Sequence, residues 1–110
     1  MLSGMITSIH QPVNTSGNNL AVDSDAQFAD AGTVQNIAIG IAALNSTTDD
    51  SIGNIAIGVS ALTGLETGDK NIAIGKGAGE SITGTSNNVV IGYDALSQGA
   101  GAADSVAIGY

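Results

Sequence analysis

The sequence predicts an all-β fold, a parallel β-solenoid of about 17 residues per coil, and two observations carry this prediction. First, a five-residue phrase, Asn-Ile-Ala-Ile-Gly or a close variant, recurs along the chain. It stands at Asn36–Gly40, Asn54–Gly58, Asn71–Gly75, Asn88–Gly92 and Ser105–Gly109. Second, the first residues of successive phrases are separated by 18, 17, 17 and 17 positions. A nearly constant period of this length is typical of stacked coils.

Each phrase reads as a short strand. Its β-branched residues occupy the second and fourth positions, and residues two apart share one face of a strand. We expect these side chains to form the solenoid core: Ile37, Ile39, Ile55, Ile57, Ile72, Ile74, Val89, Ile91, Val106 and Ile108. The small residue between them, such as Ala38, faces the other way. The glycine that ends the phrase marks the point where the chain bends.

A second short element follows each of the first four glycines. It contains Ala43-Leu44, Ala61-Leu62, Ala78-Gly79 or Ala95-Leu96, and a polar turn region comes after it. This arrangement predicts two strands and two turns per coil, with four to five repeats in residues 35–110. Stacking of equivalent strands would place Asn36, Asn54, Asn71 and Asn88 in an amide ladder, which stabilises parallel in-register strands.

The segment Met1–Val34 does not show the repeat, so we expect a boundary before Gln35. It holds the only proline, histidine and phenylalanine of the chain, and no charged side chain precedes Asp23. It lacks the basic start and the apolar run of a secretory signal. Two interpretations stay open, and both can hold: the segment caps the first coil, or it docks the protein onto a partner. The candidate docking residues are Leu2, Met5, Ile6, Ile9 and Val13.

Composition and charge exclude several classes of function. Ten acidic residues stand against two lysines and no arginine, for a formal net charge of −8. Phosphate binding requires Lys or Arg, so we expect neither nucleic acid nor an anionic membrane as a partner. No segment has the length of a membrane span. With 16 glycines, no tryptophan and no cysteine, the composition suits thin stacked layers without disulfides.

The sequence predicts no enzymatic activity, no metal and no cofactor. The only histidine, His10, lies outside the repeats, and there is no cysteine to act as a nucleophile. Asp49-Asp50 is an adjacent acidic pair that could bind calcium, but the regular glycine–aspartate spacing of calcium-binding β-rolls is absent. Gly75–Gly79 contains Gly-Lys-Gly-Ala-Gly, yet it lacks the spacing of a phosphate loop and follows the repeat register.

Two other functions of solenoids fit less well. Hexapeptide acyltransferases have a six-residue internal repeat, which this sequence lacks, and none of its repeats carries a histidine. Ice-binding solenoids align threonines in flat ladders. Here five threonines fall at differing offsets from their glycines: Thr47, Thr63, Thr67, Thr83 and Thr85.

The phrase and the small-residue element after it resemble the head repeat of trimeric autotransporter adhesins. Similar repeats occur in phage tail-fibre and virion surface proteins. The resemblance covers about 35–110 and includes Ala-Ile-Gly-Val-Ser-Ala-Leu at Ala56–Leu62 and Val-Ile-Gly-Tyr-Asp-Ala-Leu at Val90–Leu96. It implies a left-handed β-roll with three chains around an axis. The sequence departs from a complete adhesin, because it shows no signal peptide, coiled-coil stalk or membrane-anchoring barrel.

We therefore expect a non-enzymatic structural protein, a homotrimer on the surface of a phage particle. A capsid decoration (cement) protein is favoured over a short fibre, because no distal domain is visible and the neutral segment Met1–Val34 suits docking. Its expected partners are further copies of itself and, through that segment, the major capsid protein or another virion protein. The alternative is the head fragment of a bacterial trimeric adhesin, located on the cell surface.

Overall fold

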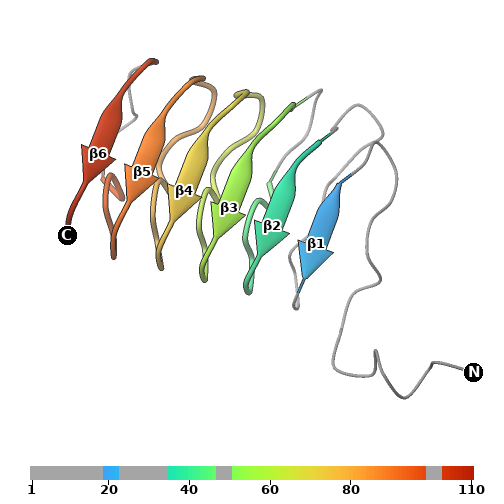
Figure 1. Cartoon of the computed structure of the whole chain (residues 1–110), viewed down its shortest axis with the longest axis horizontal. Helices are drawn as coiled ribbons and strands as arrows, with labels where there is room; N and C mark the ends of the chain where they lie inside the picture. The colour runs from blue at the N-terminus through green and yellow to red at the C-terminus, as the bar shows by residue number, and fades with distance from the viewer. Residues whose placement is uncertain (1–18, 23–34, 47–50, 99–102) are drawn as a thin grey trace, which may run out of the picture.

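The chain forms one parallel sheet with its strands stacked in sequence order (Figure 1). The structure, a computed structural model, describes residues 19–22, 35–46, 51–98 and 103–110. In these residues the sheet has six strands. They are β1 (Leu20–Val22), β2 (Ile37–Ile39), β3 (Ile55–Ile57), β4 (Ile72–Ile74), β5 (Val89–Ile91) and β6 (Val106–Ile108).

The strands pair in the register that the repeat predicts. Ile55 lies beside Ile72, Ala56 beside Ala73 and Ile57 beside Ile74, and the other neighbouring strands pair in the same way. Each coil therefore places its copy of the phrase directly on the copy below. The predicted parallel β-solenoid and its period of about 17 residues are confirmed.

Strand β1 belongs to a sixth copy of the phrase, which was not predicted from the sequence. Asn19-Leu20-Ala21-Val22 pairs in parallel with β2, and Leu20 lies beside Ile37, 17 residues away. The solenoid therefore includes residues before Gln35, and the expected boundary does not mark its start. This copy escaped notice because Asp23 replaces the glycine and Leu20 replaces a β-branched residue.

The second element of each described coil is a turn rather than a strand, so the prediction of two strands per coil is wrong. Residues 41–46, 59–64 and 76–81 form turns. The physical reason is backbone conformation: Ser60 and Leu62 have φ of 61° and 51°, in the left-handed region, where an extended strand cannot form. These turns still bond to the next coil, because the Leu62 N–H donates to the Ala78 carbonyl at 3.0 Å.

The strands also face the opposite way from the prediction. The central small residue points into the coil, where Ala38, Ala56 and Ala73 are fully buried. The flanking β-branched residues point outward, and Ile74 is 38% exposed. The reason is that the coil interior has no room for large side chains from the strand. The interior is filled from the turn side by the buried side chains of Leu44, Leu62, Leu65 and Ile82.

The interior is accordingly narrow. A methyl group at Gly79 would lie 3.7 Å from the Ala73 Cβ on the opposite wall. Only a small side chain fits the inward position of the strand. The ten residues predicted as the solenoid core therefore form its outer face instead.

The predicted amide ladder is confirmed, and it lies inside the coil. The Oδ1 atom of Asn54 accepts the backbone N–H of Asn71 at 2.8 Å, and Asn71 Oδ1 accepts that of Asn88 at 3.0 Å. The Nδ2 group of Asn71 donates across the coil to the Thr85 carbonyl at 2.8 Å. Asn36, Asn54, Asn71 and Asn88 are all fully buried. Each of the four side chains thus links its coil to the next, and those of Asn36, Asn54 and Asn71 also bond within their own coil.

The glycines that end the phrase form a second column with no room for a side chain. Gly58 and Gly75 have φ of 131° and 129°, and a Cβ at Gly75 would lie 2.5 Å from the carbonyl oxygen of Gly92. Both the conformation and the close approach of the next coil therefore require glycine. Gly53 differs, because the nearest atom to an added Cβ is a side-chain carbon at 3.6 Å.

We predict that Gly75→Ala destabilises the fold by about 2 kcal/mol or more, through backbone strain and overpacking. The matched control is Gly53→Asn, since the equivalent position of a later coil already holds Asn87 with φ of 63°. That control should shift stability by less than about 1 kcal/mol. Denaturant unfolding followed by circular dichroism measures both. Equal costs at the two sites would contradict the close glycine contact.

We predict that Asn71→Ala costs about 2–4 kcal/mol, because it removes several bonds and leaves the buried N–H of Asn88 without its acceptor. The neighbouring Asn87→Ala is the control. The Asn87 side chain bonds only the exposed Asp104 carboxylate among the hydrogen bonds described, at 2.8 Å. It should cost less than about 0.5 kcal/mol. Thermal unfolding of the two variants gives the comparison, and a mild effect of Asn71→Ala would contradict the role of the ladder.

Candidate interaction surface

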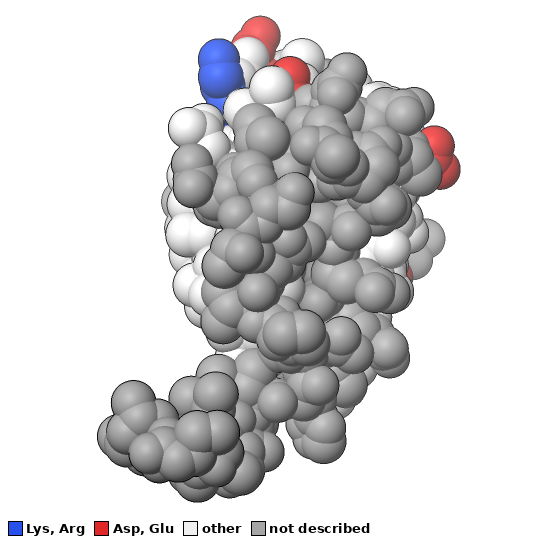
Figure 2. All heavy atoms as spheres, turned by 90° about the vertical axis from the view of Figure 1, so that its right-hand side faces the viewer, with Lys and Arg blue, Asp and Glu red and all other residues white. Residues whose placement is uncertain are grey.

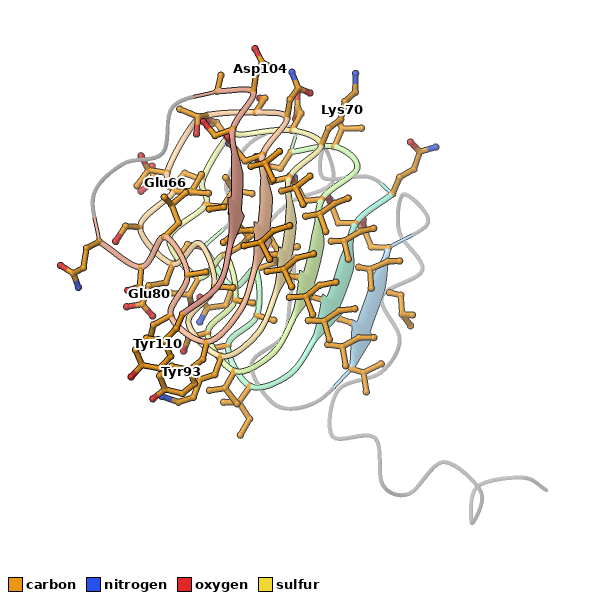
Figure 3. The ribbon with its side chains drawn as sticks, turned by 60° about the vertical axis from the view of Figure 1, so that its left-hand side comes forward. Glu66, Lys70, Glu80, Tyr93, Asp104 and Tyr110 are labelled. Atoms are coloured by element: carbon orange, nitrogen blue, oxygen red, sulfur yellow. The ribbon has the colours of Figure 1, made fainter. Side chains whose placement is uncertain are left out.

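The outer face of the sheet is a regular apolar surface. Its two columns consist of Ile37, Ile55, Ile72, Val89 and Val106, and of Ile39, Ile57, Ile74, Ile91 and Ile108, with Leu20 and Val22 below them. None of these side chains is charged, and Figure 3 shows the rows projecting from one side of the strands. Contiguous apolar patches of this kind mark sites of interaction with another protein or a membrane.

One corner of the coil extends this apolar surface. The residue directly after each phrase glycine stands at the carboxyl end of the strand, and these residues form the C-end column. Its members are Ile41, Val59, Lys76, Tyr93 and Tyr110, all of them exposed. Within it, the rings of Tyr93 and Tyr110 stack with centroids 5.5 Å apart, and the Lys76 Nζ lies 5.1 Å from the centre of the Tyr93 ring.

The opposite corner, at the amino end of the strands, is more polar. We call it the N-end column, defined by Ile52, Asp69 and Ser86 together with the residues that follow each of them, Gly53, Lys70 and Asn87. The Asp69 Oδ1 atom accepts the Ile52 N–H at 2.9 Å, and the Asp69 N–H donates to the Ser86 hydroxyl at 2.9 Å. One neighbouring coil therefore holds the Asp69 carboxylate, and the other holds the Asp69 backbone. Figure 3 shows Lys70 and Asp104 at one end of the strands and Tyr93 and Tyr110 at the other.

Two acidic side chains of the described coils lie on the side away from the apolar sheet face. Glu66 and Glu80 project from the turn side, opposite the strand side chains (Figure 3). In Figure 2 the red atoms lie at the top and the right-hand edge, whereas the left-hand edge, formed by the strands, is white. The molecule therefore presents one apolar face and one acidic side.

The residues considered for chemistry give no assembled catalytic or metal site in the described part of the chain. His10 and the pair Asp49-Asp50 lie outside the described residues. Among the described residues, no group of three or more His, Cys, Asp and Glu side chains could hold a metal ion. In the segment Gly75–Gly79, the Ala78 N–H donates to the Gly75 carbonyl at 3.1 Å, so the segment forms a turn of the coil, as its repeat register indicates.

The candidate docking residues also lie outside the described residues, so their role stays a prediction: Leu2, Met5, Ile6, Ile9 and Val13. The C-end column was not predicted from the sequence. Its signal is a residue one position after each glycine, at the repeat spacing, that is apolar or aromatic in four of five coils. The pattern indicates an interaction surface only once the fold shows that these residues are exposed at one corner of the coil.

No family model matches this chain, and comparisons with curated proteins and with solved structures found no significant match. A search of the described residues for a helix long and apolar enough to cross a membrane found none.

Proposed function

We propose that the chain is a non-enzymatic structural protein that works as a homotrimer on the surface of a phage particle. The observation that carries the proposal is the uncharged outer sheet face, with its columns of Ile and Val left uncovered by the rest of the described chain. A single chain that leaves such a face in water lacks the stabilisation that burial of these Ile and Val side chains would give. Three copies with their faces turned toward a common axis would bury it.

The width of the sheet supports three copies. A strand with its two flanking residues spans about 17 Å at 3.3 Å per residue. Three such sheets, arranged as the sides of a triangular prism, would each lie about 5 Å from the axis, which is half the usual ~10 Å spacing of packed sheets. The Ile and Val side chains would fill that space. Four sheets would lie about 8 Å from the axis and leave a void, which packed interiors avoid.

A face-to-face dimer would also cover the sheet, but the corners argue against it. Ile41, Val59 and Tyr93 remain exposed at the C-end column. Two sheets packed face to face leave both corners in water. In a ring of three, each corner meets a neighbouring protomer, so the sheet face and the exposed corner residues are covered together.

The proposed location is the virion surface, as a capsid decoration protein or a short fibre. A trimeric solenoid of this type would be a rigid column with acidic side chains of the turn side, such as Glu66 and Glu80, outward, which favours solubility and discourages non-specific association. Attachment to the capsid or another virion protein would use the segment before the solenoid. The second candidate is the head of a bacterial surface adhesin, favoured by the resemblance of Ala56–Leu62 and Val90–Leu96 to that head repeat.

We predict that Ile74→Asp prevents assembly of the trimer but leaves the single chain folded. The side chain lies on the outer face, so the variant should give folded chains with the 10.7 kDa mass of one chain, whereas the unmodified protein should have three times that mass. The control is Ala73→Asp, one residue earlier and 0% exposed, which should unfold the coil because it buries an unpaired carboxylate. Light scattering and circular dichroism provide the two measurements. A trimer that survives Ile74→Asp, or an unmodified monomer, would contradict the proposed assembly.

We predict that antibodies against the solenoid label phage particles. Immunogold electron microscopy of a lysate from cells that carry the gene should show gold on virions, on capsids for a decoration protein and on tails for a short fibre. Cells without the gene are the control. Label on the cell envelope, with bare virions, would favour the adhesin and reject the phage location.

A further inference from the structure

We propose that the trimer closes through its corners, with the C-end column of one protomer packed against the N-end column of the next at the same coil level. This inference rests on the proposed homotrimer and specifies which residues meet in it. The two columns stand at opposite ends of the strands, on either side of the apolar face (Figure 3).

Symmetry fixes the pairing. When three sheets face a common axis parallel to the stacking direction, the carboxyl ends of the strands of one sheet adjoin the amino ends of the next. A closed three-fold ring involves rotation without translation, so equivalent coils lie at the same height. Each residue of the C-end column therefore meets the N-end residues of its own coil, contributed by the neighbouring protomer.

In each coil, the C-end residue and the N-end residues that it would meet are chemically complementary. At the level of β3, Val59 meets Ile52 of the neighbouring copy, and these apolar side chains are 39% and 37% exposed in the single chain. At the level of β4, Lys76 meets Asp69, a cation opposite an anion. At the level of β5, Tyr93 meets Ser86 and the exposed Asn87, which offer polar partners for a phenol hydroxyl.

A shift by one coil would destroy this agreement. Raising the C-end column by one level would place Val59 against the Asp69 carboxylate and Lys76 against Ser86. Lowering it would place Lys76 against Ile52. The corner pairs thus select one register between identical apolar faces, which by themselves would tolerate a shift along the repeat. Paired charges characteristically contribute this kind of specificity rather than large affinity.

The groups that form the charged pair are already held in place within one chain. The Asp69 Oδ1 is fixed by the Ile52 N–H at 2.9 Å, and the Lys76 ammonium lies 5.1 Å from the centre of the Tyr93 ring. Within one protomer the two groups stand at opposite ends of β4, whose three residues span about 10 Å. The two groups therefore cannot pair with each other within one protomer, and they meet only across the boundary between protomers.

The test is a disulfide between neighbours in the variant Ile52→Cys/Val59→Cys. The chain has no cysteine of its own, so every cross-link comes from the introduced pair. Within one chain these positions are separated by β3, about 10 Å, which exceeds the ~7 Å limit between the Cα atoms of a disulfide. Oxidation of the double variant should give a covalent band at three times the chain mass and no longer polymer, because the ring is closed. Each single-cysteine variant should give no trimeric band.

Failure of the corner pairing and failure of the proposed homotrimer give different results. If native mass measurements show a trimer that oxidation of the double variant does not cross-link, the corner pairing is wrong while the proposed homotrimer stands. If the native mass is that of one chain, the homotrimer itself is wrong. If oxidation gives a ladder of polymers beyond the trimer, the contact does not close and the three-fold ring is rejected.

A second measurement tests the charged pair. Lys76→Glu should raise the concentration at which half of the trimer dissociates by about tenfold at low salt, and this effect should shrink at high salt. Lys76→Gln is the control, and it should shift that concentration less. If Lys76 faced the neighbouring Lys70 instead of Asp69, Lys76→Glu would strengthen the trimer. Strengthening, or equal effects of Glu and Gln, would overturn the pairing.

Discussion

The hydrogen bond between an asparagine side chain and the backbone of the next coil governs this fold. The Oδ1 of each ladder asparagine accepts the following coil's N–H, and the Nδ2 of Asn36, Asn54 and Asn71 also donates at 2.8 Å to a carbonyl near the end of the same coil. The two walls of the coil also lie close together, because a methyl group at Gly79 would lie 3.7 Å from the Ala73 Cβ. The interior therefore has room for alanine on the strand side, and the large aliphatic side chains of the strands must point outward.

That constraint connects the interior to the surface. In an ordinary antiparallel sheet with one solvated face, apolar residues point inward and polar residues point outward. Here buried amides hold the coils together, and the β-branched residues form a flat outer face with no charge. The buried asparagine amides fix the register in which the coils stack. The outer apolar surface is left exposed in the single chain. The proposed trimer would follow from this division, because association would add burial of the outer face to the stabilisation that the buried Leu and Ile side chains of each coil already supply.

The sequence predicted the architecture well and the facing of the strands poorly, and the reason is specific. Period, strand positions and the asparagine ladder all follow from the spacing of the phrase. The facing was assigned from hydrophobicity, which places Ile37 and Ile39 inside. Yet Asn36 and Ala38 are two residues apart and share a face, so a ladder inside the coil already implied alanine inside. The left-handed conformations of Ala42 and Leu44, by contrast, have no composition signal, because neither residue favours positive φ. The C-end and N-end columns could not be predicted as interaction surfaces either, since this role depends on which face of the strands points outward.

The column of phrase glycines has a consequence for how such a chain changes over generations. The phrase glycines Gly40, Gly58, Gly75 and Gly92 lie against the backbone of the next coil, and each ladder bond likewise reaches only one coil away, as in other solenoids whose stability is a sum over nearest neighbours. Duplication or loss of a whole 17-residue unit would leave every remaining contact intact, whereas an insertion of any other length would have to be absorbed in a turn. The interval of 18 residues between Asn36 and Asn54 is such a case, with one extra residue accommodated between two ladder positions that still bond at 2.7 Å. The length of the column can therefore vary in whole units while its cross-section stays the same.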